Sequence, residues 1–132
     1  MPAYASNMQE ALQVLLDKLS DMSEGERLKV LASLFGRRGK KAVSAFKIND
    51  SIMKLQGYDI YIVKGDKKKY LLFGLSYCSC EDFYLNNVLR KISKPCYHQL
   101  LLALVLAAKT PIKEVNINDF KKYLESDGAS SF

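Results

Sequence analysis

The sequence lacks the long apolar runs and the cysteine framework that define membrane and secreted proteins. Its longest apolar run, Leu100 to Ala108, is too short to span a bilayer. The first residues show neither the basic start nor the apolar core of a secretory signal, so we expect none. Three closely spaced cysteines, an odd number, fit a reducing compartment and metal binding better than disulfides. We therefore expect a protein of the cytosol or nucleus without a membrane segment.

Several catalytic patterns are absent as well. There is no Gly-x-x-x-x-Gly-Lys-Ser/Thr motif, which excludes a nucleotide-binding P-loop. No carboxylate pair, no nucleophile with its base and no open metal site is evident once the metal motif below is assigned. The sequence also has no internal repeats and no low-complexity tracts. We expect no catalytic activity and no small-molecule substrate.

What is present is the composition of an ordinary soluble protein. With 132 residues, 48% hydrophobic and 26% charged, the chain is most simply a single domain, residues 1–132. We divide it into an N-terminal helical region (6–47), a zinc-finger region (50–108) and a C-terminal short helix and tail (109–132). The net charge of +6 admits a nucleic-acid partner but does not by itself indicate one.

All three cysteines and the only histidine fall in two tight pairs, Cys78-x-Cys80 and Cys96-x-His98. Three thiolates and one imidazole complete a tetrahedral zinc shell with no open position, which is typical of a structural site. Residues two apart on an extended segment point the same way, so the first pair can face one ion from a strand end. Pro95 blocks a helix before the second pair, which we place at a turn that opens the next helix. The prediction is one structural Zn²⁺ bound by Cys78, Cys80, Cys96 and His98.

Two other interpretations of these residues stay open. Free cysteines are often buried, and three of them can simply pack in a core. Cys96 and His98 are also close enough in sequence for a catalytic pair, which would demand a reactive thiol of low pKa. However, side chains two apart on a helix diverge, and no acid or amide is evident to orient the imidazole. The use of every cysteine and histidine in two pairs favours zinc.

Periodicity predicts helices first and strands next. Ser6 can cap a helix, and Ser23 with Glu26 forms a capping box before a second helix that stops at Gly36. From Ser51 the apolar period changes to two. This pattern predicts a hairpin whose strands are Asp59–Val63 and Lys69–Phe73, joined by a turn over Lys64–Lys68. A third strand, from Leu75, is expected to carry the first ligand pair. The expected fold is α+β: N-terminal helices, a small antiparallel sheet with a zinc-bound finger, and C-terminal helices.

Helices are expected on both sides of the second ligand pair, over Glu81–Ile92 and over Leu100–Ala108. The second segment is apolar on every side and must be buried all round. Our hypothesis is that one of its flanks docks on another subunit. The alternative is a central helix covered by the sheet and the N-terminal helices. A short amphipathic helix opening at Asn118 and a polar tail from Gly128 follow.

Two clusters of basic residues are candidate contacts to nucleic acid. The first cluster lies in the expected break between helices and consists of Arg37, Arg38, Lys40 and Lys41. The second lies at the expected hairpin tip and consists of Lys67, Lys68 and Lys69. Such side chains neutralise phosphates and release counterions. Both clusters equally fit solvated loops, and the tyrosines near the hairpin can stack on bases or pack in the core.

The pattern Cys78-Ser79-Cys80, a spacer, and Cys96-Tyr97-His98 resembles the SWIM zinc-finger family, whose signature is Cys-x-Cys followed by Cys-x-His. The small chain, Leu34-Phe35-Gly36 upstream, and the apolar helix after the histidine make it similar to the stand-alone SWIM proteins of the Shu complex. The resemblance covers about residues 28–108. One position departs from it: the alanine usual three residues after the histidine is Leu101 here. We expect helix packing beside the finger to differ accordingly.

The resemblance implies a nuclear, non-enzymatic scaffold in DNA repair by homologous recombination. Its partner would be a recombinase paralog with a RecA-like ATPase fold, and the complex would promote recombinase filament assembly on single-stranded DNA. Zinc would clamp the sheet to the apolar helix, which would present an apolar face to the partner. The alternative is a zinc module that binds single-stranded DNA directly through the basic clusters.

Overall fold

A computed structural model of the chain describes residues 3–48, 52–64, 68–92 and 94–125. These residues form an α+β fold, which confirms the predicted class. The elements follow in the order α1 (Ala3–Ser20), α2 (Glu24–Ile48), β1 (Ile52–Leu55), β2 (Ile60–Lys64), β3 (Lys69–Phe73), β4 (Tyr77–Cys78), α3 (Glu81–Phe83), the π-helix η1 (Tyr84–Leu89), α4 (Tyr97–Ala107), β5 (Lys113–Val115) and α5 (Ile117–Glu125).

The sheet has the strand order β4-β3-β2-β1-β5. The strands β1 to β4 pair antiparallel, as predicted, with Leu72 of β3 opposite Cys78 of β4. β5 pairs with β1 in parallel, Lys54 opposite Glu114, so the sheet is mixed and the prediction of a purely antiparallel sheet is wrong at this edge. A strand of three residues carries too little alternation to be recognised in a sequence.

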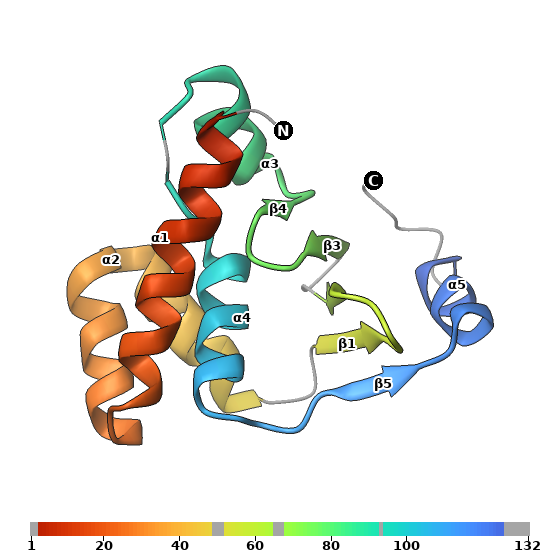
Figure 1. The fold of residues 1–132 in the computed structure, drawn as a ribbon, viewed down its shortest axis with the longest axis horizontal. Coiled ribbons are helices and arrows are strands. Elements are labelled where there is room, and N and C mark those ends of the chain that lie inside the picture. Colours follow the sequence, from red (N-terminus) through yellow and green to blue (C-terminus); the bar gives the residue numbers. More distant parts are fainter. Residues whose placement is uncertain (1–2, 49–51, 65–67, 93, 126–132) are drawn as a thin grey trace.

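The sheet lies between two hydrophobic clusters. On one face, Tyr61, Val63 and Leu72 belong to the main core, which the sheet shares with α1, α2 and α4. On the other face, Ile62 packs in a smaller cluster with Phe120 of α5. Figure 1 shows the large helices on one side of the strands and α5 on the other. The molecule therefore has three layers, and β4, at one edge of the sheet, leads directly into α3.

The predicted pair of N-terminal helices is present, with its capping box. The amide of Glu26 donates to Ser23 Oγ at 3.3 Å, and Ser23 Oγ donates to Glu26 Oε1 at 2.9 Å. Arg27 Nε donates to the carbonyl of Leu19 at 2.7 Å, which satisfies one of the last carbonyls of α1. α1 begins at Ala3, so the predicted start at Ser6 is wrong. Alanine has the highest helix propensity and favours this longer first turn.

Gly36 separates two helical stretches of α2, which confirms the predicted helix stop at this residue. Its φ of 56° and ψ of −126° are not helical, and glycine adopts this region without a Cβ penalty. The helix resumes at once, and a Cβ on Gly39 would lie 1.9 Å from the carbonyl oxygen of Leu31. The two halves of α2 therefore cross in close contact. Residues 37–41 lie in a helical turn, so their prediction as part of a loop between helices is wrong.

α4 occupies the centre of the main core. Every residue from His98 to Val105 is at most 5% exposed. α1 and α2 cover the helix together with the sheet (Figure 1). The chain thus buries α4 by itself, and the hypothesis that a flank of α4 docks on another subunit is wrong. Among the described residues, no helix is both long enough and apolar enough to cross a membrane.

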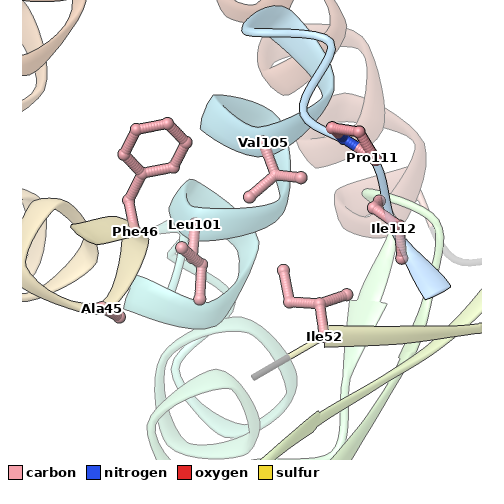
Figure 2. Close-up of a pocket in the computed structure, with 7 residues that line it drawn as sticks. All are labelled: Ala45, Phe46, Ile52, Leu101, Val105, Pro111 and Ile112. Atoms are coloured by element: carbon pink, nitrogen blue, oxygen red, sulfur yellow. The ribbon is translucent and has the colours of Figure 1, made fainter. Parts of the chain in front are cut away.

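A small apolar cavity lies against α4, where Leu101 forms part of its wall (Figure 2). Val105 of α4 and residues from α2, β1 and the segment before β5 complete the lining; the latter are Ala45, Phe46, Ile52, Pro111 and Ile112. The volume of about 20 Å³ is enough for at most one water molecule and excludes a metabolite. Because Leu101 borders this space, an alanine at that position would enlarge it.

The segment 81–92 differs most from its prediction as one α-helix. α3 has three residues and continues as the π-helix η1, in which Arg90 N donates to the carbonyl of Leu85 at 3.0 Å. Lys91 then takes a positive φ of 54°, which ends the helical path before Ile92. The wider π-turn lets the adjacent Asn86 and Asn87 both face inward, where both are buried.

Candidate metal centre

The four predicted ligands meet where the edge of the sheet reaches the start of the central helix. Cys78 ends β4, and Cys80 is the N-cap of α3. Cys96 is the N-cap of α4, and His98 lies in the first turn of that helix. From the sequence, we expect the end of a strand to supply the first pair of ligands and the start of a helix to supply the second. The structure adds a second helix start, which carries Cys80.

The ligand atoms of Cys78, Cys80, Cys96 and His98 all lie within 4.8 Å of one another. His98 Nδ1 is 3.7 Å from Cys78 Sγ and 3.9 Å from Cys96 Sγ, so Nδ1 is the nitrogen that faces the sulfurs. All four side chains are buried. In the described part of the chain, this is the group of His, Cys, Asp and Glu side chains that could hold a metal ion. Its donors fit a metal that prefers sulfur and imidazole ligands.

The surrounding backbone favours negative charge on the sulfurs. The amide of Phe83, at the start of α3, donates to Cys80 Sγ at 3.4 Å. At the start of α4, Cys96 N donates to Gln99 Oε1 at 3.0 Å, and Gln99 Nε2 donates to the carbonyl of Leu75 at 3.0 Å. Gln99 thus ties Cys96 to the residues that lead into β4. Helix starts stabilise thiolates, because their free amides and dipole carry positive charge.

Hydrogen bonds among the thiols give the three cysteines different pKa values. The pKa of Cys80 is lowered because its sulfur accepts hydrogen bonds, first from Cys78 and then from Cys96. The pKa of Cys78 is raised, chiefly by its hydrogen bond to Cys80. The pKa of Cys96 is raised by burial and by the two neighbouring sulfurs. Cys80 is therefore the thiol of the set that ionises most readily, and a metal that binds all three sulfurs displaces their protons.

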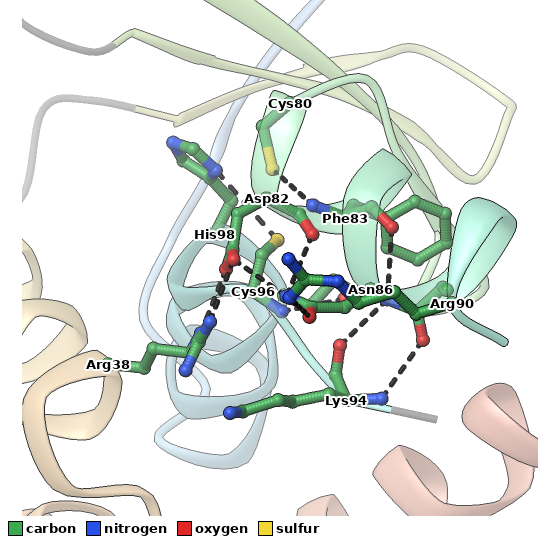
Figure 3. Close-up of polar contacts among 11 residues, drawn as sticks. Arg38, Cys80, Asp82, Phe83, Asn86, Arg90, Lys94, Cys96 and His98 are labelled. Atoms are coloured by element: carbon green, nitrogen blue, oxygen red, sulfur yellow. Dashed lines mark hydrogen bonds and ion pairs between the residues drawn. The ribbon is translucent and has the colours of Figure 1, made fainter. Parts of the chain in front are cut away.

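A network of polar side chains fixes the segment between the two ligand pairs (Figure 3). Arg38 reaches from α2 to Asp82 and forms a bidentate ion pair, with both nitrogen–oxygen distances 2.8 Å. The hydrogen bonds to Asp82 raise the pKa of Arg38. Asn86 Nδ2 donates to Asp82 Oδ1 at 2.8 Å. Asn87 closes the loop before Cys96 by accepting from Lys94 N at 3.0 Å and donating to Lys94 O at 2.7 Å.

Sequence reasoning missed this network. The sequence suggests Arg38 as a nucleic-acid contact, and it indicates no role for Asn87 or Gln99. Two adjacent asparagines in an otherwise apolar helical pattern are a weak signal of inward-facing polar groups. The pairing of Arg38 with Asp82 joins residues far apart in the chain, and no local pattern indicates it.

Aromatic rings enclose the histidine. The centroid of the His98 ring lies 4.4 Å from that of Tyr70 and 3.9 Å from that of Tyr97. Lys41 Nζ lies 4.3 Å from the centroid of the Tyr97 ring. His98 Nε2, the nitrogen turned away from the sulfurs, is buried and has no hydrogen-bond partner among the described residues.

The predicted nucleic-acid contacts separate into groups. Arg38 is engaged by Asp82, and Lys69 is a buried residue of β3 whose Nζ donates to the carbonyl of Tyr123, so its prediction at a solvent-facing hairpin tip is wrong. Arg37 and Lys41 line a hollow beside the cysteines. Lys40 and Lys68 are exposed. Lys67 lies outside the described residues.

Comparison with known proteins identifies no relative: no protein-family model, no curated protein and no solved structure matches the chain. The chemistry of the site therefore rests on its geometry. Four converging protein donors leave no obvious position for a substrate on a four-coordinate ion, which is the arrangement of a metal that holds a fold together.

Proposed function

We propose that Cys78, Cys80, Cys96 and His98 bind one structural Zn²⁺. The observation that carries this proposal is the convergence of all four buried ligand atoms within 4.8 Å. Three thiolates and a neutral imidazole would leave the complex with about one net negative charge, which the starts of α3 and α4 offset. Zinc bound in this way supplies on the order of 10 kcal/mol of apparent folding free energy.

We further propose that the protein is a non-enzymatic scaffold of the SWIM type. In this proposal it binds a RecA-like recombinase paralog in the nucleus and supports recombinase filament assembly during homologous recombination. The support is the ligand pattern Cys-x-Cys and Cys-x-His, together with a closed ligand set that keeps the metal out of catalysis. Direct binding of single-stranded DNA is the alternative to this function.

Since α4 is buried, the partner needs another surface. The best candidate is the η1 surface, which we define as four apolar residues that project into solvent from η1 and the turn after it: Tyr84, Leu85, Leu89 and Ile92, with Leu89 57% exposed. At the neighbouring edge of the sheet, the exposed rings of Phe73 and Tyr77 stack with centroids 5.4 Å apart. Apolar side chains clustered in this way are typical of protein interfaces.

The basic side chains beside the η1 surface favour an acidic partner. Arg90, Lys91 and Lys94 are all exposed and follow η1 directly. An apolar centre with a charged rim is the usual build of a specific interface, and the rim sets which partners approach. The proposal therefore expects the recombinase paralog to present apolar side chains flanked by acidic ones.

Co-purification of the zinc-loaded protein with candidate recombinase paralogs tests the scaffold function. Leu89→Asp should abolish the complex, because it places a charge in the centre of the η1 surface. Leu34→Asp is the matched control, since Leu34 is equally exposed, at 65%, but lies on α2. If both variants retain the complex, the η1 surface is not the docking site. If the wild-type protein binds no paralog, the scaffold proposal fails.

A further inference from the structure

A hollow of about 400 Å³ lies beside the metal centre, on the side of α2. Arg37 and Lys41 line it from α2, and two of the proposed metal ligands, Cys80 and His98, form the wall toward the metal centre. The aromatic part of the lining is Tyr70 of β3 and Tyr97 of α4. The volume falls within the range of about 300–1,000 Å³ that is usual for sites of small ligands. Unlike the cavity beside Leu101, this hollow combines cations, aromatic walls and room for a ligand.

Two positively charged side chains of the hollow are not paired with carboxylates. Arg38 is neutralised by Asp82, but Arg37 makes no ion pair with any other described residue. Lys41 contacts the Tyr97 ring rather than an acid. Glu81, the other acidic residue of the lining, is exposed to solvent, where its charge is screened. An arginine fork beside a lysine is a combination that suits a phosphate group.

A buried donor belongs to the same wall. Nδ1 of His98 faces the sulfurs, so when Nδ1 binds the zinc proposed above, the neutral imidazole has its proton on Nε2. A histidine that binds a metal usually donates this proton to a carboxylate, a carbonyl or a water. His98 Nε2 has no such acceptor among the described residues. A ligand oxygen in the hollow would supply one.

We propose that this hollow binds the phosphate of a nucleotide-sized ligand. Arg37 and Lys41 hold the phosphate, His98 Nε2 donates to one of the ligand's oxygens, and the tyrosine side of the hollow accommodates the sugar or base. The phosphate belongs either to a free nucleotide or to a single strand of nucleic acid. The site does not depend on the recombinase partner, so it stands or fails separately from the scaffold function.

The test uses the zinc-loaded protein with three probes: thymidine, thymidine 5′-monophosphate and a short fluorescent oligothymidine. Calorimetry and fluorescence anisotropy should show saturable binding of both phosphate-bearing probes and at least tenfold weaker binding of thymidine. Oligothymidine bound more tightly than the mononucleotide assigns the site to a strand, and the reverse assigns it to a free nucleotide. Absence of saturable binding of either phosphate-bearing probe overturns the proposal.

Charge-removing variants locate the binding. Arg37→Gln and Lys41→Gln should each weaken it about tenfold, the effect of losing one charge-assisted hydrogen bond. Lys40→Gln is the matched control, because Lys40 neighbours Lys41 and is exposed but does not line the hollow. It should change the affinity less than twofold. Equal losses for Lys40→Gln and Lys41→Gln would show diffuse surface attraction and overturn the site.

Two further measurements separate binding from folding. All three glutamine variants should keep the wild-type zinc content and melting temperature, because the replaced side chains are exposed. The imidazole ¹⁵N resonance of His98 Nε2 should shift when thymidine 5′-monophosphate is added to the wild-type protein, and Lys41→Gln should need about ten times the concentration for the same shift. An unshifted resonance in the saturated wild type would remove His98 from the site.

Discussion

Two helical segments each follow a cysteine of the candidate metal centre, but they differ in how deeply they are buried. α4 follows Cys96 and is buried along nearly its whole length by the rest of the chain. α3 and η1 follow Cys80, yet Tyr84, Leu85 and Leu89 project into solvent. α4 is held by packing along nearly its whole length, whereas the packing of the other segment is confined to Phe83 and Val88, so polar contacts and the proposed metal ligands contribute more to its stability.

This difference explains why a small protein would need a metal at this place. Burial of apolar area stabilises α4, but the η1 segment has little such area to bury. A metal bound by Cys80 and Cys96 would tie the exposed segment to the buried helix. The apolar side chains of η1 then stay ordered and accessible together, which is what a docking surface requires.

Removing a ligand should have the largest effect, because it breaks the tie between the two segments. Cys80→Ser or His98→Ala should abolish zinc binding and cost a large part of the metal's contribution, which is on the order of 10 kcal/mol. Circular dichroism and zinc analysis measure both losses. Ser76→Ala, in the exposed turn before β4, is the control and should keep both. A ligand variant that melts like the wild type would contradict the role of the metal.

The same substitution in the two segments should give very different losses of stability. Leu101→Ala on α4 enlarges the adjacent cavity and should cost about 2–5 kcal/mol of unfolding free energy. Leu89→Ala on η1 should cost less than about 0.5 kcal/mol, because this side chain is mostly exposed. Urea titration of the zinc-loaded variants measures both values. Equal losses would show that η1 is packed in solution.

Zinc affinity should rise with pH, because the metal binds thiolates and must displace the protons of the thiols. The raised pKa values of Cys78 and Cys96 make these two thiols hold their protons more strongly than Cys80 does. Binding therefore releases protons, and the affinity should fall as the pH is lowered. Competition with a chromophoric chelator at several pH values measures this dependence. An affinity that does not change with pH would contradict thiolate ligation.

The smallest expected effect lies in the polar link between α2 and the exposed segment. Arg38 and Asp82 are partly exposed, so their coupling should be about 1 kcal/mol despite the bidentate geometry. A double-mutant cycle of Arg38→Gln and Asp82→Asn, followed by urea titration, measures it. Zero coupling would show that this ion pair does not hold α3 against α2.

The sequence predicted what local patterns encode. The α+β class, the capping box at Ser23 and the hairpin of β2 and β3 follow from spacing and caps. The helix expected over Leu100–Ala108 is present but begins earlier, at Tyr97, so His98 lies in its first turn rather than before it. The four ligands were found because they use every cysteine and the only histidine, and they do lie together.

Features that depend on distant contacts were missed. The pairing of β5 with β1 and the ion pair between Arg38 and Asp82 join segments that no short window contains. The close approach of the two halves of α2 needs Gly39, since a Cβ there would clash with the Leu31 carbonyl, and no local pattern indicates this contact. The π-turn of η1, which lets Asn86 and Asn87 both face inward, is not indicated by helix propensity.

Native mass spectrometry of the protein purified without added metal tests the central claim most directly. The account predicts one zinc per chain, with loss of the folded charge-state distribution when the metal is chelated. Thiol reagents should then label the cysteines only after chelation. A folded protein that carries no metal, or one whose fold survives chelation, would contradict the structural zinc and the scaffold that depends on it.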